Sequence, residues 1–151
     1  MNKLFVLSTF LLTLNSALAC PDISGLYGTA EYPKNKAIFK FEQTECQKLK
    51  RSFGILSDDK KTKFLFTQDF LLDGTELCNS HGACEGATAT TDTIVLAINF
   101  NGSVASPEHG KCAHNGYSLS PDGQGNLKAI FEVKDCKDGY EGPVEKVFPK
   151  L

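Results

Sequence analysis

The chain has 151 residues, with 16 basic and 18 acidic side chains and a formal net charge of −2. This length suits a single domain, and so small a charge, mixed along the chain, argues against binding to nucleic acid or to an anionic membrane surface. The cysteine count is six, an even number that is typical of disulfide-bonded proteins in an oxidising compartment.

Residues 1–19 are predicted to be an export signal. Lys3 supplies the positive charge, a short apolar run follows, and Ala17-Leu18-Ala19 is a small-x-small cleavage site. The apolar run is shorter than the roughly 20 residues that a membrane-spanning helix needs. We therefore expect a mature domain of residues 20–151 that is secreted or periplasmic. The alternative is a lipoprotein anchored through Cys20, but Ala17 stands where such proteins usually have leucine, and lipidation would leave an odd number of cysteines.

Alternation of apolar and polar residues, which is typical of β-strands, recurs along the chain, whereas helical periodicity is almost absent. Turn-forming residues separate the alternating segments, among them Pro33, Asp58-Asp59 and Pro121-Asp122-Gly123. This spacing predicts an all-β domain, an antiparallel meander of about eight or nine strands that forms a barrel or half-barrel. The predicted strand segments with alternating apolar side chains are 37–41, 49–55, 64–72, 93–100, 117–119 and 127–133.

The cysteines form three pairs that each straddle a predicted turn. Facing residues of an antiparallel hairpin have residue numbers with a constant sum, so a bridge between neighbouring strands brackets its own turn. The sequence alone does not exclude other pairings of the six cysteines. The predicted disulfides are Cys20–Cys46, Cys78–Cys84 and Cys112–Cys136.

Two hairpins also predict their own strand register. In each hairpin, two pairs of apolar residues have the same sum of residue numbers. These pairs therefore face each other on one side of the sheet, as cross-strand packing favours. A β-bulge in either hairpin would shift its register by one residue. The predicted pairs are Tyr117–Phe131 and Leu119–Ala129 in the hairpin bridged by Cys112–Cys136, and Phe53–Phe66 and Ile55–Phe64 in the hairpin around Asp58-Asp59.

The triplet Gly25-Leu26-Tyr27, which opens the first predicted strand, resembles the Gly-x-Trp signature of the lipocalins and related calycin barrels. The meander that follows is also similar to that superfamily. The resemblance implies that Tyr27 closes one end of a barrel and packs under a basic residue near the last strand, Lys146 or Lys150. The chain departs from the family pattern because it has no tryptophan and no clear helix after the last predicted strand. The alternative is an ordinary strand start flanked by glycines.

All three histidines lie in two segments that also contain cysteines, at spacings that can coordinate zinc when the thiols are free. Oxidation to disulfides removes the thiolates, and export favours oxidation. The sequence therefore predicts no metal site, and His81, His109 and His114 are the residual candidates for one.

Two sequence motifs of hydrolytic chemistry are missing. The chain has neither a Gly-x-Ser-x-Gly nucleophile elbow nor a His-Glu-x-x-His metal-binding helix. A cysteine nucleophile is not expected when all thiols are paired. We therefore expect a protein that is not an enzyme and that needs no cofactor.

The leading hypothesis is a non-catalytic, monomeric binding protein whose barrel accepts a small apolar ligand. The alternative is a structural or protein-interaction domain, such as an inhibitor or envelope component, that acts through loops such as Cys78–Cys84. A small barrel can also be filled by its own side chains. The side chains expected to line the interior are Phe39, Phe41, Phe53, Phe64, Phe66, Ile94, Leu96, Ile98, Tyr117 and Phe131.

Overall fold

The computed structural model describes residues 19–29, 33–34, 36–59 and 61–151, so the predicted export signal, except for Ala19, lies outside the described residues. The described chain forms ten strands, and no helix long and apolar enough to cross a membrane is found in it. The strands are β1 (Gly25–Gly28), β2 (Ala37–Thr44), β3 (Lys48–Leu56), β4 (Thr62–Leu71), β5 (Asp73–Cys78), β6 (Cys84–Ala89), β7 (Ile94–Ser106), β8 (Gly110–Pro121), β9 (Leu127–Lys134) and β10 (Gly142–Phe148).

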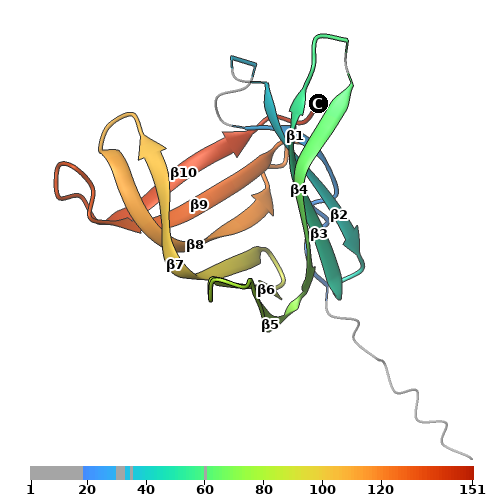
Figure 1. Cartoon of the computed structure of the whole chain (residues 1–151), viewed down its shortest axis with the longest axis horizontal. Helices are drawn as coiled ribbons and strands as arrows, with labels where there is room; N and C mark the ends of the chain where they lie inside the picture. The colour runs from blue at the N-terminus through green and yellow to red at the C-terminus, as the bar shows by residue number, and fades with distance from the viewer. Residues whose placement is uncertain (1–18, 30–32, 35, 60) are drawn as a thin grey trace, which may run out of the picture.

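The strands form an antiparallel meander divided into two sheets. The first sheet has the order β1-β2-β3-β4 and the second the order β10-β9-β8-β7-β6-β5, so neighbours in the chain are neighbours in each sheet. In Figure 1 the first sheet stands at the right and the second curves away from it at the left. The predicted all-β meander is confirmed. The ladders of the described residues make two sheets with ten strands, whereas the sequence predicts about eight or nine strands in a barrel or half-barrel.

Backbone hydrogen bonds connect the two sheets at both of their ends. At one end Tyr27 forms a bridge with Lys150, and the amide of Gly28 donates to the carbonyl of Pro149 over 2.8 Å. At the other end Leu72, between β4 and β5, donates to Gln47 over 2.8 Å and accepts from Ala89 over 3.1 Å. The two sheets therefore enclose one interior.

The three disulfides pair as predicted, and no cysteine of the described residues is free. The register that pairs Gly25 with Phe41 in β1 and β2, continued outward, also brings Cys20 opposite Cys46. Cys78 and Cys84 are direct partners in the β5–β6 ladder.

Because of β-bulges, part of the observed strand register differs from the predicted one. Phe53 faces Phe66 as predicted, but a shift after Phe53 pairs Gly54 with Phe64, so the predicted pair Ile55–Phe64 is wrong by one residue. Leu119 faces Ala129 as predicted. The β8–β9 ladder is interrupted between His114 and Ser118, and the Tyr117–Phe131 pair falls in this interruption, with its ring centroids 4.9 Å apart.

The hydrophobic core fills much of the space between the sheets. Strand β9 shows the cause, because Leu127, Ala129, Phe131 and Val133 occupy alternate positions and are all buried. Each large side chain that is buried in this way contributes about 1.5–3 kcal/mol of gross hydrophobic stabilisation. Further buried core residues include Tyr27, Phe41, Leu49 and Phe70 from the first sheet and Ile94, Leu96 and Leu119 from the second.

Candidate functional site

The interior between the two sheets contains an apolar cavity. It comprises two spaces of about 590 Å³ and about 220 Å³ that share the lining residues Ser103, Val104, Phe131 and Phe148. Cavities of this size are large enough for a small organic ligand. Six strands, β2, β3, β7, β8, β9 and β10, therefore build one site.

Aromatic side chains from both sheets contribute to the cavity wall. The ring centroid of Phe39 lies 5.4 Å from that of Phe53 and 5.6 Å from that of Phe148, so this ring joins β3 and β10. Tyr117 and Phe131 form a second, tilted pair in the lining. Rings at these separations pack favourably against one another and give the cavity a stiff apolar wall.

A charged cluster lies behind this wall, centred on Arg51 of β3. The guanidinium donates from Nη1 to the hydroxyl of Tyr117 over 2.9 Å and from Nη2 to Gln68 over 3.0 Å and to Glu85 over 2.6 Å. The ring of Phe70 lies 5.2 Å from the centre of the guanidinium. Arg51 thus connects β4, β6 and β8 across the interior.

Arg51 keeps its charge although it is only 9% exposed. Burial opposes the charged form, but Tyr117 and Glu85 more than offset this effect, so the pKa of Arg51 lies above its ordinary value. A buried cation of this kind is tolerated only with a partner of opposite charge and several hydrogen-bond acceptors. The cluster satisfies both conditions.

His114 of β8 is buried at the edge of the same interior. Its ring stands edge-on to Phe131 with 4.9 Å between centroids. A Cβ atom at Gly102 would lie 2.7 Å from the ring of His114, so glycine is needed there to leave room for it. Burial lowers the pKa of His114, and a hydrogen bond with Gly116 opposes this only in part.

The buried state of His114 has a consequence for stability. Since the folded pKa is below the ordinary value of 6.5, the unfolded chain binds more protons than the folded protein just below that pH. We expect the free energy of unfolding to fall as the pH is lowered from 7.5 to 5.5, measured by urea denaturation. The variant His114→Gln should lose this part of the slope, and an unchanged slope in the variant would contradict the assignment.

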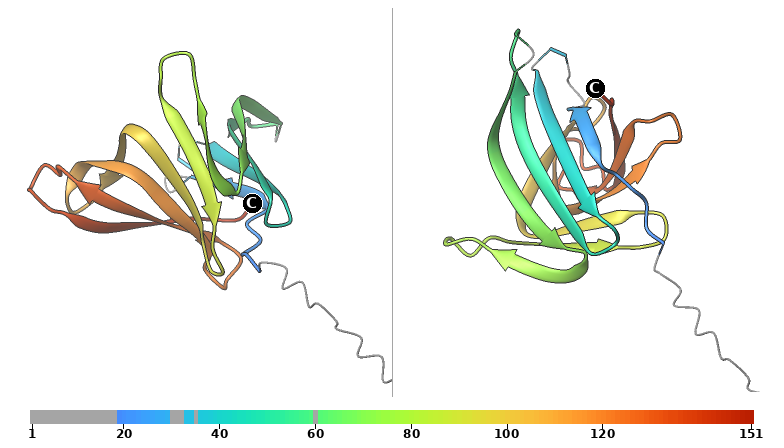
Figure 2. Two further views of the ribbon diagram at one scale, coloured as in Figure 1. Left: turned by 90° about the horizontal axis from the view of Figure 1, so that it is seen from below. Right: turned by 90° about the vertical axis from the view of Figure 1, so that its right-hand side faces the viewer.

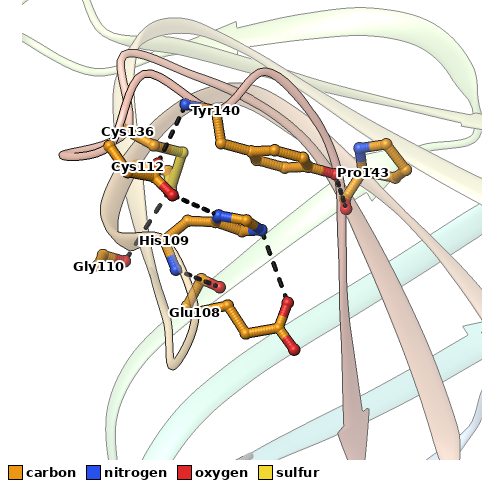
Figure 3. Close-up of a disulfide and its surroundings, with 9 residues drawn as sticks. Glu108, His109, Gly110, Cys112, Cys136, Tyr140 and Pro143 are labelled. Atoms are coloured by element: carbon orange, nitrogen blue, oxygen red, sulfur yellow. Dashed lines mark hydrogen bonds and ion pairs between the residues drawn. A yellow bond between two sulfur atoms is a disulfide. The ribbon is translucent and has the colours of Figure 1, made fainter.

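His109, in the β7–β8 turn, belongs to a separate surface cluster (Figure 3). Its Nδ1 lies 2.7 Å from a carboxylate oxygen of Asp138, and its ring stacks on Tyr140 with 3.7 Å between centroids. The bond to His109, together with the backbone amide of Tyr140, lowers the pKa of Asp138. Figure 3 shows this cluster beside the Cys112–Cys136 disulfide, where it holds the β7–β8 turn against the segment that follows β9.

The histidines are distributed over different parts of the structure. His81 is exposed in the β5–β6 turn, His109 binds Asp138, and His114 is buried. Within the described ranges, no group of three or more His, Cys, Asp or Glu residues is arranged to hold a metal ion.

The residues predicted to line the interior fall into four groups. Phe39, Phe41, Phe53, Tyr117 and Phe131 line the cavity between the sheets. Ile94 and Leu96 are buried in the core, and Ile98 is half-buried on β7. Phe64 is 40% exposed on β4. Phe66 is 49% exposed and lines a different cavity.

Several residues of the site were not indicated by the sequence. Phe148 and Val104 line the cavity. Of these two, only Phe148 could have been predicted, from the alternate positions of Val144, Lys146 and Phe148 in β10. The partners of Arg51 come from three other strands and carry no local signal.

No protein-family model, curated protein or solved structure matches the chain.

Proposed function

We propose that the protein is a non-catalytic binding protein that holds a small apolar molecule between its two sheets. The observation that carries this proposal is the cavity lined by Phe39, Phe131 and Phe148. Five of the seven residues that line this space are aromatic, and a mainly apolar wall of this kind suits the binding of an apolar molecule. A ligand that displaces water from these rings gains affinity in proportion to the apolar area that it buries.

The proposal includes a lipocalin-like barrel as the container. The backbone hydrogen bonds at Gly28 and at Leu72, one at each end of the two sheets, support a nearly closed meander. The interior of such a barrel is the natural place for a small ligand. We also propose that the protein works outside the cytoplasm, with which its three disulfides are compatible.

Filling the cavity provides the test. Ser103 of β7 lines both spaces, and its position is exposed, so a larger side chain can be placed there without displacing buried core. A fluorescent fatty-acid probe should gain emission with the natural protein, and unlabelled lipid should compete with it. The variant Ser103→Trp should bind the probe at least tenfold more weakly, since a loss of about 1.4 kcal/mol of contact already gives that factor.

The matched control is Gln124→Trp, which adds the same side chain in the exposed β8–β9 turn. It should bind the probe as the natural protein does. Equal binding by both variants, or no saturable binding by the natural protein, would refute the proposed site.

A second candidate function is protein recognition through the β5–β6 hairpin. Figure 2 shows this hairpin projecting from the body of the molecule. Its turn is held by Cys78–Cys84 and by Asn79, whose side-chain oxygen accepts from the amides of His81 and Ala83 over 2.9 and 3.1 Å. A preordered loop of this kind loses little entropy on binding. Loss of partner capture after proteolytic cleavage of the turn, with lipid-probe binding retained, would favour this function.

A further inference from the structure

A second cavity of about 350 Å³ lies on the other side of Arg51, between β4, β5, β6 and β7. Phe66, Leu77 and Phe100 line it, and these side chains are 49%, 42% and 39% exposed. Polar groups of Gln68 and Glu85 line the same space. Asn79 of the β5–β6 turn also lines this space, so Gln68 and Glu85 are the two polar lining residues that come from the strands β4 and β6.

Arg51 fixes the orientation of both polar side chains. Gln68 and Glu85 each accept from the same nitrogen, Nη2, over 3.0 and 2.6 Å, so the ends of the two side chains lie next to each other. A guanidinium only donates hydrogen bonds. The carbonyl oxygen of Gln68 must therefore face Arg51, which leaves its amide NH₂ as a donor, while Glu85 keeps a second carboxylate oxygen as an acceptor.

These two remaining groups are open to a ligand. Neither the NH₂ of Gln68 nor the second oxygen of Glu85 has a hydrogen-bond partner among the residues described. Every fully buried polar side-chain atom of these residues does have such a partner. Both groups must therefore reach solvent-accessible space, and both residues line the cavity. The site thus presents one donor beside one acceptor.

The charge of the site selects the kind of ligand. The cation of Arg51 and the carboxylate of Glu85 neutralise each other at 2.6 Å. An anion would meet Glu85 and a cation would meet Arg51, so each charged ligand gains one attraction and suffers one repulsion. An uncharged group that both donates and accepts meets no repulsion.

We propose that this pocket binds a small molecule with a carboxamide group on an apolar, preferably aromatic, body. The carboxamide NH₂ donates to the free oxygen of Glu85, and its carbonyl accepts from the NH₂ of Gln68. The apolar body lies against Phe66, Leu77 and Phe100. This site does not depend on the proposed lipid cavity, because its lining residues are different.

The test is a chemical-shift titration of the oxidised, ¹⁵N-labelled protein with three probes of equal size, namely benzamide, benzoate and benzylamine. Benzamide should shift the backbone amides of Phe66, Glu85 and Phe100 in a saturable way. Its affinity should exceed that of each charged probe by at least about fivefold, the factor that one hydrogen bond supplies.

The variant Gln68→Glu tests the recognition mechanism. It keeps an oxygen for Arg51 but replaces the donor by a second acceptor, so the preference should change from benzamide to benzylamine. The control Gln124→Glu adds the same charge in the exposed β8–β9 turn and should keep the preference for benzamide. The variant Ser103→Trp should also keep it, which separates this site from the apolar cavity.

Two results would overturn the proposal. One is the absence of saturable shifts with benzamide at the residues named. The other is an unchanged order of the three probes in Gln68→Glu, because a pocket that does not use the amide of Gln68 would not respond to its loss.

Discussion

Replacing Arg51 by methionine is expected to lower the free energy of unfolding by about 3 kcal/mol. The substitution keeps much of the apolar stem beneath Phe70 but removes the charge that Glu85 faces at 2.6 Å. A carboxylate left without its partner in a largely buried place is strongly destabilising. The side chain of Glu85 is 17% exposed, so the expected loss lies at the lower end of the range for buried pairs. Urea denaturation followed by circular dichroism measures it.

The double variant Arg51→Met, Glu85→Met separates the two causes of this loss. If the unpaired carboxylate is the main cause, removing it as well should recover most of the stability, since a buried ion pair and an apolar pair of similar volume are often nearly equivalent. No recovery in the double variant would show that the loss comes from the other hydrogen bonds of Arg51, to Tyr117 and Gln68. A loss below about 1 kcal/mol in the single variant would show that solvent screens the pair.

Removing the Cys112–Cys136 disulfide is expected to cost about 3.5 kcal/mol, because a cross-link of this loop length restricts the unfolded chain strongly. Its cysteines are separated by 24 residues in the sequence and are 1% and 7% exposed. The variant Cys112→Ala, Cys136→Ala avoids placing a hydroxyl in this buried position. Thermal and urea unfolding of the oxidised proteins give the comparison.

The Cys78–Cys84 disulfide is the internal control for this loss. It closes a loop with a sequence separation of 6 and lies in an exposed hairpin, so Cys78→Ala, Cys84→Ala should cost only about 2 kcal/mol. A larger loss from Cys78–Cys84 than from Cys112–Cys136 would contradict the loop-length account of their stabilisation.

Local patterns in the sequence were sufficient for the three disulfides and for part of the strand pairing. The disulfides follow from the position of cysteines around turns, because neighbouring strands of a meander bring residues together at a constant sum of residue numbers. The same rule gives the correct partners for Phe53 and Leu119. The strands β5, β6 and β10 were not among the predicted segments, and β5, whose residues are all exposed, has no apolar alternation to indicate it.

The bulge in β4 explains why one lining residue was placed wrongly. Adjacent residues of a strand point to opposite faces. Because Phe66 pairs with Phe53 and Phe64 pairs with Gly54, these two phenylalanines point to opposite sides of the sheet, although their spacing in the sequence indicates one side. A bulge depends on the partner strand and is not visible in local alternation.

The Arg51 cluster shows the limit of sequence reasoning for the site. In the alternating pattern of β3, Arg51 is a polar residue on an apolar face. Its acceptors Gln68, Glu85 and Tyr117 come from strands β4, β6 and β8 and meet only in the folded protein. The cavity beside Gln68 and Glu85 was not predictable for the same reason.

The most direct test of the apolar cavity is a crystal structure of the oxidised protein soaked with a bromine-labelled fatty acid. The anomalous signal of bromine locates the ligand without any assumption about its pose. We expect a peak in the space bounded by Phe39, Phe131 and Phe148, which has a volume of about 220 Å³. Bromine found only at other surfaces, with these three rings in mutual contact and the space closed, would contradict the proposed function.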